Sequence, residues 1–185
     1  MSERTFVKEK VALGDAAKRV MEALPAGILL NTQGEKFNSM VIGWGAIGTV
    51  WRSAAFTVYV RQSRFTKELL DASGEFVISV PLGDPDPVIN QVCGRQSGRD
   101  VDKEEAAGLT LVPGNKVNVP GIAEYPLTIE CKVVYAQKQE LSELPEEIVR
   151  VIYPEKVDES TGKAYRDAHT MYIGEIVDAY VIRKA

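Results

Sequence analysis

The segment Ala55-Phe-Thr-Val-Tyr-Val-Arg-Gln-Ser-Arg-Phe-Thr-Lys67 joins a strand pattern to a charged turn. Its first half alternates in polarity, with Phe56, Val58 and Val60 on one face, as expected of a strand with one buried side. Helical spacing begins at Phe65, so the segment predicts a strand, a short turn at Ser63 and then a helix.

The rest of the chain repeats strands more often than helices. The sequence predicts further strands at 27–31, 37–44, 75–80, 127–136 and 169–182, and helices at 10–24, 64–73 and 143–152. Residues 84–108 are expected to be helical or irregular, and 153–167 to be a polar loop. Gly34 is expected to supply the bend between the first two strands, and Gly174 a bulge in the last. Without a βαβ rhythm, this order favours a mainly β antiparallel barrel with peripheral helices.

Three glycines, Gly43, Gly45 and Gly48, match the spacing of a dinucleotide-binding fingerprint. No helix pattern follows them, and Val50 and Trp51 lead toward another strand instead. The glycines are therefore interpreted as barrel bends or close backbone approaches, and Rossmann-type binding is rejected.

Composition describes an ordinary globular chain of 185 residues, with 45% hydrophobic and 26% charged residues. We expect one domain spanning residues 1–185. The apolar runs are too short to cross a bilayer, and the N-terminal MSERTFVKEK lacks the apolar segment of a signal peptide, so a cytoplasmic location is expected. Two cysteines, Cys93 and Cys131, and a single histidine form neither a zinc motif nor a disulfide framework, and no metal is expected.

The net charge of −4 argues against a nucleic-acid or membrane-surface role. Between Lys36 and Lys67, however, there are five cations and no Asp or Glu. Such a cationic island suggests a small anionic ligand, although composition alone leaves chance placement on a solvated face equally open.

The turn before the second predicted helix is the strongest candidate site. Cations are unfavourable in the first turn of a helix, unless an anion lies in front of it. We interpret Ser63 as the N-cap, and favour a phosphate site over a solvated face. The candidate phosphate residues are Arg61, Ser63, Arg64, Thr66 and Lys67.

Other candidates are weaker on the residues alone. Spacing favours an ordinary polar loop for 93–103, with Gly94 and Gly98 breaking the preceding helix and Asp100 capping the next. His169 is left open between a structural and a functional role. Trp44 and Trp51 suit either a core or a wall on which a planar ligand stacks.

Taken together, these residues resemble a known family. The matching stretches, which run in order from about residue 25 to 182, are Asn38-Ser-Met-Val-Ile-Gly-Trp-Gly45, Val60-Arg-Gln-Ser-Arg-Phe-Thr-Lys67, Gly74-Glu-Phe-Val-Ile-Ser-Val-Pro81, Cys93-Gly-Arg-Gln-Ser-Gly-Arg-Asp-Val-Asp-Lys103 and His169-Thr-Met-Tyr-Ile-Gly-Glu-Ile-Val177. They are similar to the flavin reductase-like, FMN-binding split-barrel family, and most of all to its flavoredoxin branch. The resemblance implies a Greek-key split β-barrel and a homodimer that binds FMN noncovalently near the subunit interface.

The resemblance also implies roles for particular residues. Asn38, Ser39, Met40 and Val41 would line the isoalloxazine edge and Trp44 would lie against the ring. Lys103 would reach the cofactor, while His169 would stand near the reacting face as the candidate catalytic residue. The phosphate would take the five turn residues named above.

The function implied is an oxidoreductase that passes hydride from NADH or NADPH through FMN to an acceptor. The flavin performs that chemistry, and the protein supplies orientation and solvent exclusion. The sequence leaves open a non-enzymatic FMN electron carrier that serves a partner protein, and a ligand-binding barrel that has lost flavin.

Overall fold

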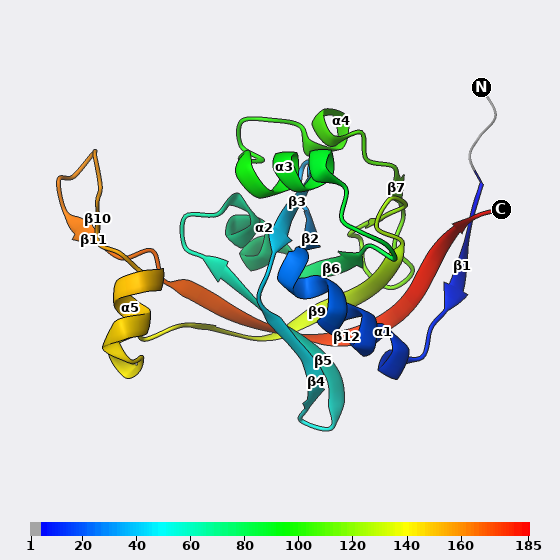
Figure 1. The fold of residues 1–185 in the computed structure, drawn as a ribbon, viewed down its shortest axis with the longest axis horizontal. Helices are drawn as coiled ribbons and strands as arrows, with labels where there is room; N and C mark the ends of the chain where they lie inside the picture. The colour runs from blue at the N-terminus through cyan, green and yellow to red at the C-terminus, as the bar shows by residue number, and fades with distance from the viewer. Residues whose placement is uncertain (1–4) are drawn as a thin grey trace.

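The computed structural model describes residues 5–185, and the first four residues of the N-terminal stretch and of the expected domain lie outside it. An eight-stranded antiparallel sheet dominates the fold (Figure 1). Its strands are β1 (Phe6–Lys10), β2 (Ile28–Gln33), β3 (Phe37–Ile42), β4 (Gly45–Val50), β5 (Ser53–Arg61), β6 (Glu75–Val80), β9 (Leu127–Lys138) and β12 (His169–Lys184). The mainly β prediction is confirmed.

The strand order shows where the barrel opens. The path runs β3-β2-β6-β9-β12-β5-β4, with β1 pairing beyond it on β12. Its two end strands, β3 and β4, are separated in the chain only by Gly43 and Trp44. The sheet therefore curls until its ends approach, but it is not closed by a ladder between them, which makes a split barrel.

The predicted alternation on β5 is confirmed by burial. Phe56, Val58 and Val60 are wholly buried within the main core. This cluster also takes side chains from β2, β6, β9 and from the helix α1 (Leu13–Ala23). Because apolar burial is the main favourable term in folding, the alternating strands set the position of the barrel wall.

At two positions, contacts with neighbouring side chains help to explain why the residue is glycine. Gly34 lies in the short bend between β2 and β3, as expected, although its φ is not positive; a Cβ there would lie 2.7 Å from Leu69 Cδ2. Gly174 does lie at the expected bulge, where the register between β12 and β9 shifts, and a Cβ would meet the Phe76 ring at 2.5 Å. Gly174 therefore requires the absence of a side chain, whereas at Gly34 the end of the Leu69 side chain would have to move.

The remaining helices lie outside the barrel. They are α2 (Phe65–Ser73), α3 (Pro87–Arg95), α4 (Lys103–Ala107) and α5 (Glu146–Ile152). Gly94 lies within α3, so the prediction that it breaks the helix was wrong. The helix predicted from residue 10 begins at Leu13, because β1 takes the residues up to Lys10.

A projecting segment, here called the arm, comprises residues 139–168 between β9 and β12. It carries α5 and the hairpin of β10 (Lys156–Val157) and β11 (Ala164–Tyr165), which stand away from the barrel (Figure 1). Sequence predicted a polar loop across this hairpin, since strands of two residues give no periodic signal. A similar pair, β7 (Leu111–Val112) and β8 (Gly121–Ile122), also escaped prediction.

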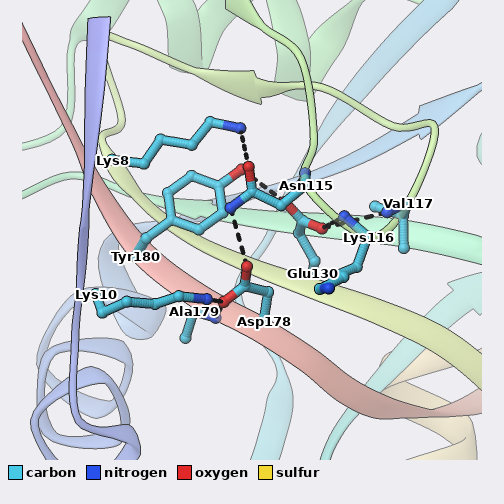
Figure 2. Close-up of polar contacts among 9 residues, drawn as sticks. All are labelled: Lys8, Lys10, Asn115, Lys116, Val117, Glu130, Asp178, Ala179 and Tyr180. Atoms are coloured by element: carbon cyan, nitrogen blue, oxygen red, sulfur yellow. Dashed lines mark hydrogen bonds and ion pairs between the residues drawn. The ribbon is translucent and has the colours of Figure 1, made fainter.

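A buried carboxylate organises the opposite end of the barrel. Glu130 on β9 is fully buried and accepts hydrogen bonds from the backbone N–H groups of residues 115, 116 and 117, at 2.6, 2.6 and 3.2 Å. The Tyr180 hydroxyl donates a fourth, at 2.7 Å (Figure 2). Every one of these donors comes from the chain itself, so the charge is internally compensated.

Candidate functional site

Two adjoining cavities open where the barrel is split. The first, of about 190 Å³, lies between β3, the start of α2 and the loop joining α3 to α4. The second, of about 140 Å³, lies between the β3–β4 junction, β5 and the start of β12. Met40, Val41 and Arg64 line both cavities, which makes them parts of one site.

Ten of the twelve residues predicted from the sequence line one cavity or both. The first cavity takes Asn38, Ser63, Thr66 and Lys103 in addition to the shared residues. The second takes Trp44, Arg61 and His169. Ser39 and Lys67 line neither, although both lie beside residues that do.

The turn before α2 differs from its predicted arrangement. The residue in the N-cap position is Arg64, and no side chain caps the helix. Ser63 instead donates its hydroxyl to Asp167 Oδ2 at 2.6 Å and its backbone N–H to Asp167 Oδ1 at 3.1 Å. The prediction of Ser63 as N-cap was wrong, because a buried carboxylate from the arm takes its donors.

The three cations of this turn have different surroundings. Arg61 donates to the carbonyls of Asp167 and Ile152, each at 3.0 Å. Lys67 pairs with Asp71 one turn along α2, at 2.5 Å. Arg64 is exposed at the junction of the cavities, and among residues 5–185 its guanidinium has no hydrogen-bond or ion-pair partner. It is therefore the cation of the turn that is free for an external anion.

Lys103 supplies a second cation from the other side of the first cavity. Its ammonium is buried and donates to the carbonyls of Ser39 at 2.6 Å and Cys93 at 3.1 Å. Burial lowers the pKa of Lys103, the nearby Cys93 thiol opposes this shift, and Arg64 adds to it. Since an ammonium has three N–H groups, one remains for a ligand.

The helix that carries Lys103 is capped by Asp102, whose side chain accepts from the backbone N–H groups of residues 104 and 105. The predicted cap, Asp100, was thus wrong by two positions. Capping fixes the first turn of α4 and, with it, the direction of the Lys103 side chain.

Arg99 is a cavity residue that sequence reasoning did not single out. It lines the first cavity, donates to the Ser63 carbonyl at 3.2 Å, and forms an ion pair with Glu68. Its guanidinium also lies over the Phe65 ring, 5.4 Å from the centroid. The Ser97-Gly-Arg99 stretch contributes to the family resemblance, but the spacing of residues within the loop does not single out this arginine.

One acceptor in the first cavity lacks a donor. Asn38 is buried and donates through Nδ2 to Thr66 Oγ1 at 2.9 Å. Its Oδ1 is, within residues 5–185, the single buried side-chain oxygen or nitrogen without a hydrogen-bond partner. Leaving such an atom unpaired costs about 1–3 kcal/mol, so a ligand with an N–H or O–H group would be stabilised here.

Ser39 serves the site indirectly. Its hydroxyl donates to Asn31 Oδ1 at 2.8 Å, away from the cavity, while its carbonyl holds Lys103. The structure therefore places Ser39 behind the cavity wall and not on it.

His169 lies on the wall of the second cavity between two aromatic rings. The Trp44 ring centroid is 4.9 Å away and that of Tyr153 is 5.4 Å away. Burial, together with the charges of Arg61 and Arg64, lowers the pKa of His169 to about 4, against the opposing charge of Asp167. The imidazole is therefore neutral near pH 7.

The thiols are not candidate nucleophiles. Cys93 lines the first cavity but burial raises its pKa, and Cys131 is fully buried with its pKa raised as well. A reactive cysteine requires a lowered pKa. Among residues 5–185, no group of three or more His, Cys, Asp or Glu is arranged to hold a metal ion, and no helix is long and apolar enough to span a membrane.

Comparison with known proteins gives a consistent result. The model of the "Flavin reductase like domain" family matches residues 21–185. An uncharacterised protein of Archaeoglobus fulgidus is 35% identical over 102 residues, which are 54% of this chain and 55% of that protein. The chain thus matches about half the length of that curated relative.

Two solved structures share the fold. A flavoredoxin of Desulfovibrio vulgaris (Miyazaki F) superposes with a TM-score of 0.62 at 26% identity, covering 84% of this chain and 68% of that one. An FMN-binding domain of a flavin reductases-like enzyme from Shewanella baltica gives a TM-score of 0.62 at 20% identity, covering 98% and 79%. The split-barrel architecture read from the strand order is that of these structures.

Proposed function

The chain belongs to the flavin reductase-like domain family, and from that premise we propose that it binds FMN noncovalently and acts as an oxidoreductase, passing hydride from NADH or NADPH to an acceptor. One observation carries the proposal. Arg64 is an exposed cation without a partner among residues 5–185, at the junction of two cavities that contain further donors.

The donor set fits FMN. Charged donors for a phosphate in the first cavity come from Arg64 and from the N–H groups of Arg99 and Lys103 that are left over from their contacts within the chain. Asn38 Oδ1 supplies the acceptor that an N–H or hydroxyl group of the same ligand needs. Arg61, Ser63 and Lys67 were expected to hold the phosphate directly. We assign them a supporting role, because two carbonyls fix the Arg61 guanidinium, the Ser63 hydroxyl donates to Asp167, and Lys67 pairs with Asp71 and lines neither cavity.

The second cavity suits the ring system and the electron donor. When bound, FMN supplies a ring that accepts and releases electrons or hydride. Met40 and Val41 provide an apolar wall between the cavities, while Trp44 shields the wall beside His169. A neutral His169 can orient a bound group by hydrogen bonding, without acting as a general base.

A second candidate function is that of an FMN electron carrier for a partner protein. The similarity to a flavoredoxin at 26% identity favours it, and no residue of the cavities identifies a nicotinamide site by itself. The two functions share the same FMN site and differ only in the reaction with nucleotide.

Anaerobic mixing of the FMN-loaded protein with NADH and with NADPH separates these functions. Rapid bleaching of the flavin absorption band supports the reductase. Bleaching by neither nucleotide, with FMN bound, supports the carrier. A protein that does not bind FMN in a titration would overturn both and favour a barrel that has lost flavin.

We also infer a homodimer. The arm stands away from the barrel (Figure 1) and carries exposed apolar side chains, of which Val151 and Val157 are 68% and 64% exposed. Apolar groups on a projecting element are stabilised when a second copy covers them. Light scattering of the FMN-loaded protein is expected to give twice the chain mass, and a monomer mass would contradict the inference.

A further inference from the structure

The arm contributes a side chain to the site that no sequence motif marked. Tyr153 follows α5 and is almost completely buried beside His169. Its hydroxyl lies 2.8 Å from His169 Nδ1 and donates to Gln139 Oε1 at 2.9 Å. Three residues, two of them from the arm, thus form a chain of hydrogen bonds that ends at the second cavity.

We propose that Tyr153 is a positioning residue: with Gln139, it holds His169 as the Nδ1–H tautomer, so that Nε2 faces the second cavity as an acceptor for the carboxamide N–H of a nicotinamide nucleotide. The tautomer follows from the arm contacts alone. The identity of the donor rests on the proposed reductase function.

The hydrogen bonds of Tyr153 allow only one tautomer of His169. A tyrosine hydroxyl has one hydrogen, and here it is given to Gln139. The contact between Tyr153 and His169 must then use the Nδ1–H of the imidazole as donor. Because a neutral imidazole carries one N–H, Nε2 holds a lone pair.

The position of Nε2 follows from its surroundings. His169 lines the second cavity. Within residues 5–185, Nε2 has no hydrogen-bond partner, and it keeps some accessible surface. The lone pair is therefore accessible from the cavity.

The charges around His169 select the ligand group. Arg61 and Arg64 face it from the turn before α2, Tyr59 lies on the same cavity wall, and Asp167 precedes it in the arm. The two arginines disfavour an imidazolium, so the ring accepts a hydrogen bond without taking up a proton. A carboxamide N–H is a neutral donor of this kind, and the electron donors of the proposed reaction carry one.

The tautomer can be measured directly, because His169 is the one histidine of the chain. Nitrogen-15 NMR of the protein without nucleotide is expected to show a protonated Nδ1 and an unprotonated Nε2. In Gln139→Ala, the Tyr153 hydroxyl loses its acceptor and turns its hydrogen toward Nδ1, which moves the proton to Nε2. Gln139→Glu keeps an acceptor and is expected to keep the parent tautomer.

A kinetic experiment compares Tyr153→Phe with Tyr165→Phe, the matched control on the exposed hairpin. Tyr153→Phe is expected to raise the KM for NADH or NADPH about tenfold, with FMN affinity unchanged, whereas Tyr165→Phe changes neither. That factor corresponds to one lost hydrogen bond of about 1.4 kcal/mol. Gln139 is only half-buried, so its variants test the inference even if Tyr153→Phe does not fold.

Three outcomes would overturn parts of the inference. A protonated Nε2 in the parent, or an unchanged tautomer in Gln139→Ala, would remove the positioning role. An unchanged KM in Tyr153→Phe, with the tautomer altered, would remove the carboxamide contact. No bleaching of the parent by either nucleotide would overturn the reductase function and the carboxamide contact, while the NMR result would still decide the role of Tyr153.

Discussion

The Glu130 cluster and the first cavity both gather hydrogen-bond donors around the place of an anion, but they differ in where the anion comes from. At Glu130 the carboxylate belongs to the chain, and three backbone N–H groups and a tyrosine hydroxyl converge on it (Figure 2). In the first cavity Arg64 has no anion from residues 5–185, although the chain brings other donors to it. A filled anion site stabilises the fold, whereas an unfilled one is available for a ligand.

The contact between Asp167 and Ser63 is intermediate between these two cases. Asp167 is buried and occupies the two donors of Ser63, a residue on the wall of the first cavity. Part of the expected phosphate site is thus already filled from within. The remaining donors, on Arg64, Arg99 and Lys103, make the site that a ligand can use.

The largest expected effect comes from removing the carboxylate of the filled site, Glu130. Glu130→Ala leaves its backbone N–H groups and the Tyr180 hydroxyl without an acceptor, and should lower the free energy of unfolding by about 3–5 kcal/mol. Urea denaturation measures the change. Glu143→Ala, at an exposed position, is the control and should have almost no effect. A loss below about 1 kcal/mol for Glu130→Ala would show that the cluster is not a structural anion site.

The next effect concerns protonation beside the cavity. The pKa of His169 is about 4 in the folded protein and about 6.5 when unfolded, so the unfolded chain binds the proton first. Its contribution to stability is complete above pH 6.5 and falls by about 3 kcal/mol on going to pH 4. His169→Gln should remove that part of the pH dependence, measured by denaturant unfolding at both pH values. Parallel pH profiles for parent and variant would contradict the lowered pKa.

Arg64→Ala tests the unfilled site. Loss of one charge-assisted hydrogen bond of roughly 1.5–3 kcal/mol should weaken FMN binding by about 10- to 100-fold and leave riboflavin binding nearly unchanged. Arg52→Asn is the matched control, because Arg52 lies at the exposed β4–β5 turn, and asparagine tolerates its positive φ of 66°. Equal weakening of both ligands would mean that Arg64 supports the fold and does not contact the phosphate.

Asp167→Asn should produce the smallest change, in the opposite direction. The amide keeps an acceptor for Ser63 but removes a negative charge beside the first cavity, so FMN should bind about three- to tenfold more tightly, a gain of roughly 0.6–1.4 kcal/mol. Riboflavin binding should not change, and Glu159→Gln on the exposed hairpin should change neither. Weaker binding of both ligands would identify Asp167 as an anchor of the arm without influence on the phosphate.

The sequence predicted the barrel well where the strands are long and alternate. β5 alternates cleanly, and β2, β3, β6, β9 and β12 each contain a run of buried residues, so all six were predicted. The polar edge strand β1 and the glycine-containing β4 were missed. A two-residue strand such as β10 has no period to detect. Local pattern thus predicts elements that bury one face and fails for those that do not.

The site shows a different limit. Local sequence identified the charged turn, and Arg64 and Lys103 do line the first cavity. It did not reveal that Asp167 and Tyr153 approach this turn and His169 from the arm, because contacts between such distant segments leave no trace in spacing. Whether a donor already has a partner within the chain depends on the folded structure. Arg61 has such partners and Arg64 does not, among residues 5–185.

The most direct test compares FMN with riboflavin on the unmodified protein. The two ligands share the ring and ribityl chain and differ in the phosphate. If the first cavity is a phosphate site, FMN should bind at least about 100-fold more tightly at low ionic strength, equivalent to about 2.7 kcal/mol from charged donors, and salt should narrow the difference. Equal affinities for FMN and riboflavin would contradict the account.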